Sequence, residues 1–360
     1  MSRALISTFF LLQVAFLKSF AAVIPTNGVN VPPPSLNIIP GFNVDYVGGP
    51  NLLDELTVFK LLIDALIHFS WQGDEGQEKA QDFKIPDEHD TYLYMRGIHN
   101  DEEDTSIERK LLIEALFQIT GYFTRGARVS DATTGLSVDG IYKGFVLIIG
   151  PDTPRPPPDA LAQLTHGNAL PIPLQNVRSV SYVDDSAPQP DLANIDAAAL
   201  TSSEQGIGTT ASTETANNAS SSDTLGAHRN IRVKWREDPV RKEDLFYALA
   251  GGLATIAKFP VVSKAIYMPL RCDGSPLVLR IIPNEAIRDP RIAFTFGNAN
   301  DAMAKIMDET TRLNKYRELY VLVDIAGFDP EGKKTAGIVE ILKVEGDVQG
   351  GEGTIEVLRN

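Results

Sequence analysis

The sequence predicts an α+β protein made of two similar two-layer domains, each close to a ferredoxin-like βαββαβ arrangement with one added strand. Three short segments recur in the same order at a separation of roughly 190 residues, which is typical of an internal duplication. These are residues 42–46 and 231–235, residues 96–100 and 280–284, and residues 144–149 and 337–342. Each copy reads as strand, helix, hairpin, helix, hairpin, a pattern that packs helices on an antiparallel sheet. A mixed sheet with another strand order would fit the same pattern.

Composition divides the chain into six segments. They are a signal peptide at residues 1–21, a Pro-rich lead at 22–40, the first copy at 41–150, a linker at 151–228, the second copy at 229–345 and a Gly-rich tail at 346–360. The linker begins with prolines and continues mostly in Ala, Ser and Thr. Such a composition buries too little apolar surface to offset chain entropy, so we expect a disordered linker.

The amino-terminal residues indicate export. An apolar run at residues 4–17 follows the basic residue Arg3, and small residues precede Ala22. This run is shorter than the roughly 20 residues that a spanning helix needs. We therefore expect cleavage after Ala21 or Ala22, a secreted extracellular protein and no stable membrane insertion afterwards; a retained signal anchor is the alternative. Asn218, in a sequon of the linker, is then the expected glycosylation site.

In the first copy, apolar residues spaced three and four apart predict a helix that opens at Pro50 and a second over residues 106–123. Thr105 and Glu108 have the spacing of a capping box. The acidic run at residues 101–104 precedes that helix, where it complements the helix dipole. It lacks the turn glycine and distal glutamate of a calcium loop.

In the second copy, Asp238 is the expected N-cap of a helix over residues 239–259, because proline is favoured at the first helical position. A second helix is expected over residues 300–313. Gly252 and the other small residues at 248–254 fall inside the first of these helices, where glycine needs a packing reason. We expect this small face to let the helix approach the sheet or, if the copies pack together, the other copy.

Strand-forming residues flank turn sequences and predict hairpins. The expected hairpins pair residues 128–132 with 141–149 in the first copy, and 265–271 with 276–282 and 319–326 with 335–343 in the second.

Charge and motifs exclude several classes of function. The formal net charge is −14, which argues against a nucleic-acid partner. The single cysteine, Cys272, allows no intramolecular disulfide, and no histidine lies nearby in sequence to activate it as a nucleophile. No nucleophile elbow, phosphate loop or dinucleotide fingerprint occurs, and no two histidines are spaced i, i+4. We expect no metal and no cofactor.

One constellation recurs, namely Arg96 with Asp131 in the first copy and Arg280 with Asp324 in the second. If their strands are neighbours, each pair could form a bidentate ion bridge. The alternative is a binding site in which the arginine holds an anionic group and the carboxylate acts as a base. We interpret the pairs as structural.

Three classes of function fit the sequence. The first is a secreted, non-enzymatic interaction or effector-like protein that binds an extracellular protein or glycan. The second is an extracellular hydrolase whose site lies between the copies, where Asp131 and Asp324 could converge. The third is a structural or surface-coat protein. We expect the copies to pack on each other; an interdomain pocket with convergent carboxylates would favour the hydrolase, and a flat shared interface would favour the interaction protein.

Overall fold

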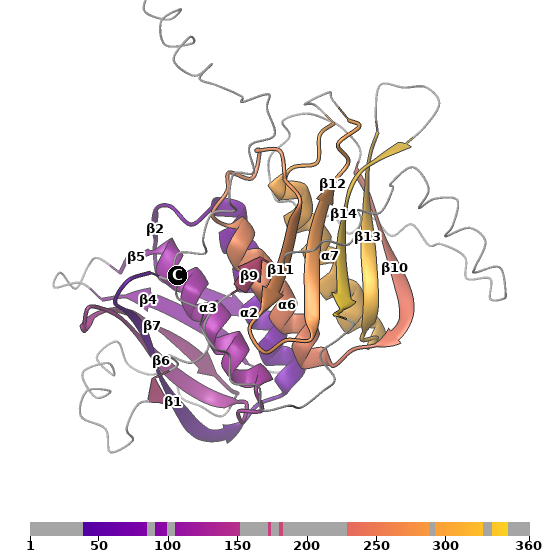
Figure 1. The fold of residues 1–360 in the computed structure, drawn as a ribbon. Coiled ribbons are helices and arrows are strands. Elements are labelled where there is room, and N and C mark those ends of the chain that lie inside the picture. Colours follow the sequence, from indigo (N-terminus) through magenta and orange to yellow (C-terminus); the bar gives the residue numbers. More distant parts are fainter. Residues whose placement is uncertain are drawn as a thin grey trace, which may run out of the picture. The chain divides into compact units, whose positions relative to one another are not determined.

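A computed structural model describes residues 39–84, 91–98, 105–151, 172–173, 180–182, 229–287, 292–326 and 333–344. They form two antiparallel sheets with helices between them (Figure 1). The predicted signal peptide, Asn218 and the carboxyl-terminal tail lie outside the described residues, as do residues 101–104 and most of the lead and linker.

Each half of the protein has the predicted order of strand, helix, two strands, helix, two strands. The first half contains β1 (Phe42–Leu52), α2 (Glu55–Gln72), β3 (Gln81–Lys84), β4 (Tyr92–Gly97), α3 (Arg109–Thr124), β6 (Ser130–Val138) and β7 (Ile141–Ile149), with the short strands β2 (Gln77–Glu78) and β5 (Ile107–Glu108) paired together. The second half contains β10 (Arg229–Pro239), α6 (Lys242–Ile256), β11 (Met268–Cys272), β12 (Leu277–Pro283), α7 (Phe296–Leu313), β13 (Arg317–Ala326) and β14 (Lys333–Lys343).

The strand order confirms the α+β class and corrects the topology. Neighbouring strands run β3-β4-β7-β6-β1 in the first sheet and β11-β12-β14-β13-β10 in the second, and all of these pairs are antiparallel. A ferredoxin-like sheet contains parallel neighbours joined by split βαβ units. Here the final hairpin instead inserts between the first strand and the middle hairpin, so the ferredoxin-like prediction is wrong.

The two sheets also share their register. The first strand of each half meets the fourth strand with an irregularity at the same place, and corresponding residues are 187 positions apart. The matched pairs are Gly48–Ala132 and Leu52–Ser130 in the first sheet, and Trp235–Leu319 and Pro239–Arg317 in the second. By this register, residues 42–46 correspond to residues 229–233, two positions from the predicted match.

Two short strands come from the segment predicted to be a disordered linker. β8 (Ile172–Pro173) pairs with β1, and β9 (Val180–Tyr182) pairs with β11. At these two places the linker adds an extended strand to the edge of each sheet.

The first helix of each half begins later than its proline suggested. β1 and β10 continue through Pro50 and Pro239, and α2 starts only at Glu55. There the carboxylate of Asp54 accepts the Thr57 N–H at 2.8 Å. Proline suits an irregular edge strand because it has no N–H to donate. Capping by Asp54 therefore sets the start of α2, and the predicted start at Pro50 is wrong.

Two other predicted caps also differ. Arg241, and not Asp238, occupies the N-cap of α6, and its side chain makes no capping bond. Glu108 lies in β5 and at the N-cap of α3, so the capping box predicted with Thr105 does not form.

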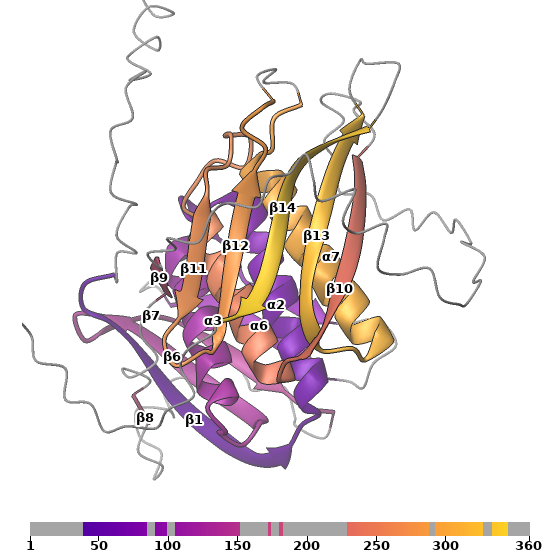
Figure 2. The same ribbon diagram turned by 45° about the vertical axis from the view of Figure 1, so that its right-hand side comes forward.

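The helices of the two halves pack against each other between the sheets (Figure 2). α6 contacts both α2 and α3, and α2 also contacts α7. Phe59 and Phe246, each the fifth residue of its helix and 187 positions apart, stack with ring centroids 5.1 Å apart. Phe117 and Tyr247 stack at 5.4 Å. Side chains of both halves thus belong to one hydrophobic core.

Buried hydrogen bonds supplement this packing. The Asn300 side chain, 0% exposed, donates to the Ser70 hydroxyl at 2.8 Å and to the Ile67 carbonyl at 3.3 Å. Gly252, by contrast, lies against Leu279 and Met303 of its own half. Of the two expected neighbours of this small face, Gly252 therefore meets its own sheet and not the other half.

Truncation of the stacked rings tests whether the two halves depend on each other. We expect Phe59→Ala and Phe246→Ala each to lower the free energy of unfolding by about 3–5 kcal/mol, because each opens a cavity in the shared core. Chemical denaturation followed by circular dichroism and by fluorescence should show one coincident transition. Ile141→Ala, at a side chain 63% exposed, is the control that should change little. Two separate transitions would contradict a shared core.

Burial of Glu114 on α3 gives a pH-dependent prediction. Burial raises the pKa of Glu114, and the Gln118 hydrogen bond and the charge of Lys258 offset this only in part. When folding raises the pKa of an acid, the folded protein loses stability as pH rises from the unfolded pKa of that acid, about 4.3, through its folded pKa. We expect Glu114→Gln to be more stable than the wild type at pH 7 and equal to it near pH 4, measured by denaturation. Glu285→Gln, at an exposed acid, should show no such difference; equal stability of Glu114→Gln and wild type at pH 7 would contradict the prediction.

Candidate functional site

Asp131 lies at the start of β6, where it holds the irregular end of β1. Its carboxylate, in a residue only 6% exposed, accepts the Asn51 backbone N–H at 3.0 Å and the Asn51 side-chain amide at 3.1 Å. A Cβ on Gly49 would lie 2.3 Å from this carboxylate, so the glycine makes room for it. These contacts give Asp131 a structural position.

The counterpart of Asp131 in the second half is Glu318, 187 positions later. Glu318 is 7% exposed and accepts the Lys343 backbone N–H at 2.8 Å. A buried carboxylate therefore occupies the same position in both halves but binds a different strand end, Asn51 of β1 in the first half and Lys343 of β14 in the second. The sequence comparison had matched Asp131 with Asp324.

The structure does not bring together either predicted arginine–aspartate pair. Arg280 lies opposite Glu340, which lies opposite Tyr320. Asp324 lies on β13, which is separated from the Arg280 strand β12 by β14, and it is four residues further along β13 than Tyr320. These steps amount to about 10 Å across the sheet and about 13 Å along it. Arg96 and Asp131 are separated in the same way, with Phe145 and Gly135 between them.

Asp324 instead binds Arg232 of β10. The guanidinium donates twice to the carboxylate, at 2.8 and 3.2 Å, and the Thr335 hydroxyl donates to it at 2.8 Å. Asp324 is 2% exposed, whereas 39% of the Arg232 side chain is exposed. The buried acid thus orients an arginine that reaches solvent.

Glu340 holds two arginines in a similar way. Arg280 donates to its carboxylate at 2.9 Å, and Arg236 lies 3.5 Å from the other oxygen. The Arg236 guanidinium also lies over the Tyr320 ring, 5.9 Å from its centroid, a cation–π geometry.

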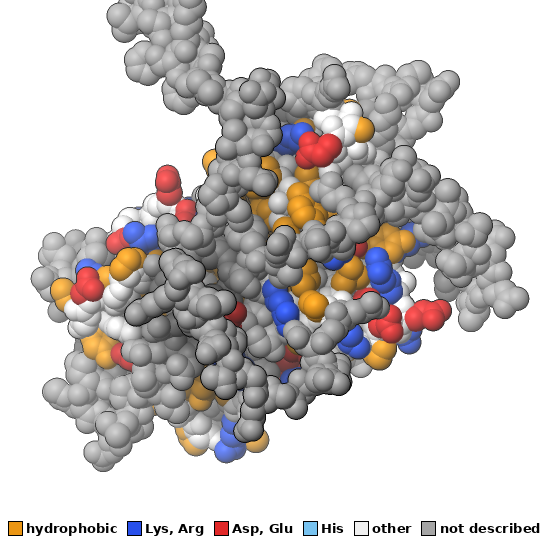
Figure 3. Space-filling model, in the orientation of Figure 1, with side chains coloured by type: hydrophobic (Ala, Val, Ile, Leu, Met, Phe, Trp, Pro, Cys, Tyr) orange, Lys and Arg blue, Asp and Glu red, His pale blue; other side chains and the backbone are white. Residues whose placement is uncertain are grey.

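These side chains share the face of the second sheet that points away from the helices. Along β10 the apolar residues Ile231, Val233 and Trp235 pack towards the core, so the alternate residues Arg232 and Lys234 point outward. Blue side chains lie beside orange ones over this sheet in Figure 3. We call this surface the basic face; it comprises Arg232, Lys234, Arg236, Arg280 and Tyr320 with the carboxylates of Asp324 and Glu340.

The corresponding face of the first sheet has a different chemistry. Asp45, Val47 and Gly49 occupy the positions of the three cations of β10. An apolar and aromatic cluster lies on this face, formed by Phe145, Leu147 and Ile149 with Tyr92, Tyr94 and Ile98. The outer face of the second sheet carries a smaller one, formed by Ile282, Leu322 and Ile338 with Tyr267 and Tyr320. Two sheets with the same backbone pairing therefore share an apolar patch on their outer faces but differ in the charged side chains beside it.

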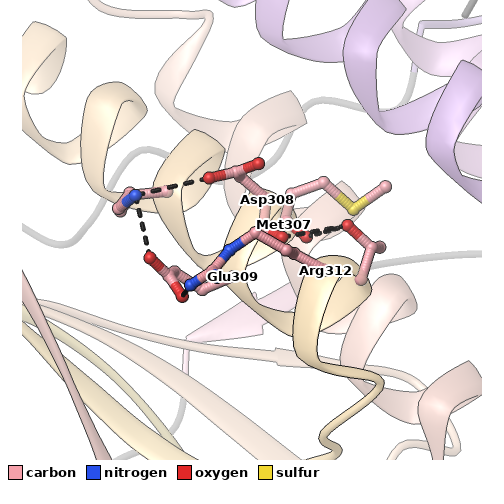
Figure 4. Close-up of polar contacts among 6 residues, drawn as sticks. Met307, Asp308, Glu309 and Arg312 are labelled. Atoms are coloured by element: carbon pink, nitrogen blue, oxygen red, sulfur yellow. Dashed lines mark hydrogen bonds and ion pairs between the residues drawn. The ribbon is translucent and has the colours of Figure 1, made fainter. Parts of the chain in front are cut away.

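The outer surface of α7 holds a second group of charges. Lys305 lies 3.3 Å from Asp308 and 2.9 Å from Glu309, and Arg312 also binds Glu309 (Figure 4). Burial alone would raise the pKa of Glu309, but the hydrogen bonds and charges of Lys305 and Arg312 together lower it. Spacings of three and four along one helix are typical of a solvated helix face, so we interpret this network as support for α7.

A pocket of about 410 Å³ lies where β10 leads into α6. Its charged lining residues are Arg241, Asp244 and Lys343, and the others are proline, valine and leucine. Arg241 lies 3.7 Å from the Asp244 carboxylate, and burial raises the pKa of that carboxyl. The lining includes no hydroxyl, thiol or imidazole group, so the pocket offers no nucleophile with an adjacent base.

Cys272 lies inside the second half and not at a surface. It is 2% exposed, its thiol is 3.3 Å from the Tyr247 carbonyl, and burial raises its pKa far above the ordinary range. A thiol in this state is a poor nucleophile. Among the described residues, no three His, Cys, Asp or Glu side chains are grouped to hold a metal ion.

The sequence contained the signal for the basic face, but we used it only to recognise a repeat. In residues 231–235, apolar and cationic side chains alternate strictly, which is typical of a strand with one buried and one charged face. The carboxylate partners Asp324 and Glu340 could not be assigned without the strand order.

Comparison with protein-family models, with curated proteins and with solved structures finds no match to this chain. Within the part of the chain that the structure describes, no helix is long and apolar enough to cross a membrane.

The structural position of Asp131 can be tested by truncation. We expect Asp131→Ala to lower the free energy of unfolding by about 1–3 kcal/mol, because two donors of Asn51 lose their acceptor. Thermal or chemical denaturation of the purified protein measures the change. Asp308→Ala, at an acid whose side chain is 62% exposed, should have a much smaller effect. If Asp131→Ala were as stable as the wild type, the claim that Asp131 has a structural role would be wrong.

Proposed function

We propose that this chain is a secreted, non-enzymatic interaction protein, built from an internal duplication, that binds an extracellular partner through the basic face. The observation that carries the proposal is the contrast between the two halves. Their backbone pairing is the same, whereas their outer faces present different side chains. Site chemistry grafted on a common scaffold is how folds acquire function.

The duplication is supported by backbone pairing more strongly than by residue identity. Strand order, register and the position of the irregularity between the first and fourth strands all agree in the two halves. The stacked rings of Phe59 and Phe246 also occupy equivalent positions on opposite sides of the interface. Two equivalent residues in mutual contact are typical of an isologous, twofold arrangement.

The basic face has features of a recognition surface. Buried carboxylates hold Arg232 and Arg236 at one end while their side chains remain 39% and 45% exposed. Arginine and tyrosine, together with tryptophan, are enriched in binding hot spots. Because the whole chain has a net charge of −14, a cationic face directs an acidic partner to one location.

No specific observation favours the hydrolase or the coat protein. A hydrolase site between the halves would need carboxylates that converge there. Instead, helices α2, α3, α6 and α7 fill the space between the sheets. Asp131 and Asp324 belong to different sheets, and each carboxylate is bound by neighbours in its own half. A shared helical interface is the arrangement that we expect of the interaction protein.

Site-specific photo-crosslinking of the full chain tests the proposed function. The protein is expressed in secreting cells, and mass spectrometry of its amino terminus should show cleavage after Ala21 or Ala22. A photoreactive residue at position 234 should capture an extracellular component, and the same residue at the exposed position 141 on the first sheet should not. Equal capture at both positions would contradict the proposal. Hydrolysis of an extracellular polymer that is lost in an Asp131→Asn, Asp324→Asn double variant would replace it with the hydrolase.

A further inference from the structure

Strand β10 is an edge of the second sheet, and β13 is its neighbour among the described strands (Figure 1). An edge strand presents backbone N–H and C=O groups that can pair with another extended chain. The corresponding strand of the first sheet, β1, is paired in this way with β8 at Asp45 and Tyr46. These two residues are the counterparts of Arg232 and Val233. The same scaffold therefore accepts an added antiparallel strand at this place in one half.

The outward side chains of β10 indicate which sequence would pair there. Arg232 and Lys234 alternate on the outer face, and Arg236 reaches the same face through its contacts with Glu340 and Tyr320. Side chains directly opposite each other on paired strands lie about 4.5–5.5 Å apart, and opposite charges stabilise such a pair. An incoming strand would therefore place carboxylates at alternate positions. Among the described residues, the basic face holds four cations and two carboxylates, so its charge favours acidic residues on an incoming strand.

The inward side chains define the other half of the pattern. Ile231, Val233 and Trp235 are only partly buried and pack against the edge of the core. Apolar residues on an incoming strand would cover them, with one apolar residue between each pair of acids. Glu237 and Asp238, exposed at the end of β10, would repel further acids, which limits the acidic positions to those beside residues 232–236.

We propose that β10 binds an extended acidic segment of a partner protein as an added antiparallel strand, in which Asp or Glu alternates with apolar residues. The acids lie beside Arg232, Lys234 and Arg236, and the apolar residues extend the core at Val233. Main-chain hydrogen bonds supply affinity and the alternate side chains supply specificity, as in β-strand addition generally. The inference rests on the proposed function and names the chemistry of its partner.

A second copy of this chain fits the same edge poorly. If two β10 strands paired antiparallel around Lys234, then Lys234 would face its own copy and Arg232 would face Arg236. Like charges directly opposite each other destabilise a sheet. Charge also protects an edge strand from unwanted pairing, so protection alone is the simplest competing explanation of these cations.

The test uses the mature full chain and an eight-residue peptide in which glutamate alternates with valine. Fluorescence anisotropy of the labelled peptide measures the Kd, and hydrogen exchange reports protection of the amides of residues 230–236. We expect a Lys234→Glu, Arg236→Glu double variant to bind at least about ten-fold more weakly. Lys264→Glu, which reverses an exposed charge elsewhere in the same half, should bind within about two-fold of the wild type.

A second peptide keeps the test valid if the double variant fails to fold. N-methylation of alternate peptide amides removes the backbone donors and retains every charge, and the wild-type protein is used. We expect this peptide to bind at least about ten-fold more weakly than the unmodified one. Equal binding of the two peptides, or equal binding of a sulfated polysaccharide, would replace strand addition with a general anion-binding patch.

Three other outcomes would also overturn the inference. Equal binding of a peptide with lysine in place of glutamate would remove the role of charge. A dimer in sedimentation that the double variant abolishes would assign the edge to a second copy. Absence of binding with continued photo-capture at position 234 would reject strand addition and leave the proposed function standing. Absence of both peptide binding and photo-capture would reject strand addition and the proposed function together.

Discussion

The packing of α6 between the two halves is the constraint on which the rest of the structure depends. Every residue from Asp244 to Ile256 is buried, so this helix has no face that can meet solvent. One side covers its own sheet through Gly252, and other sides meet α2 and α3 through Phe246 and Tyr247. A helix that is buried all round needs partners on every side. The second half therefore requires the first in order to cover α6.

This constraint separates the inner and outer surfaces of each sheet. The inner faces and the helices must stay apolar and complementary, because they form one core. The outer faces lie outside that core, and several of their residues differ in charge between the halves although each face keeps an apolar cluster. Leu147 and Tyr94 in the first half correspond to Glu340 and Arg280 in the second. A common scaffold with two independent outer faces can thus carry a binding surface on one side without loss of the shared core.

Local patterns in the sequence were enough to predict the helices, the hairpins and the α+β class, because apolar spacing and turn residues act over short distances. They could not predict that the final hairpin inserts beside the first strand, which depends on long-range pairing. They also matched Arg280 with Arg96, and residues 231–235 with residues 42–46, as equivalent positions of the two halves. Each error is a shift of two residues, which keeps every side chain on the same face of its strand and so leaves the alternating pattern unchanged. The true partners of Asp324 and Asp131 follow only from the register.

The linker breaks the symmetry of the two halves at their edges. β8 pairs with β1 and β9 pairs with β11, which are not equivalent strands. β10, the counterpart of β1, and β3, the counterpart of β11, each have no second neighbour among the described strands. β3 has only four residues, whereas β10 has eleven, and β10 is the edge on which cations alternate with apolar residues. The longer of these two edges thus also carries the alternating cations, and this combination is the reason that we propose strand addition at β10 and not at β3.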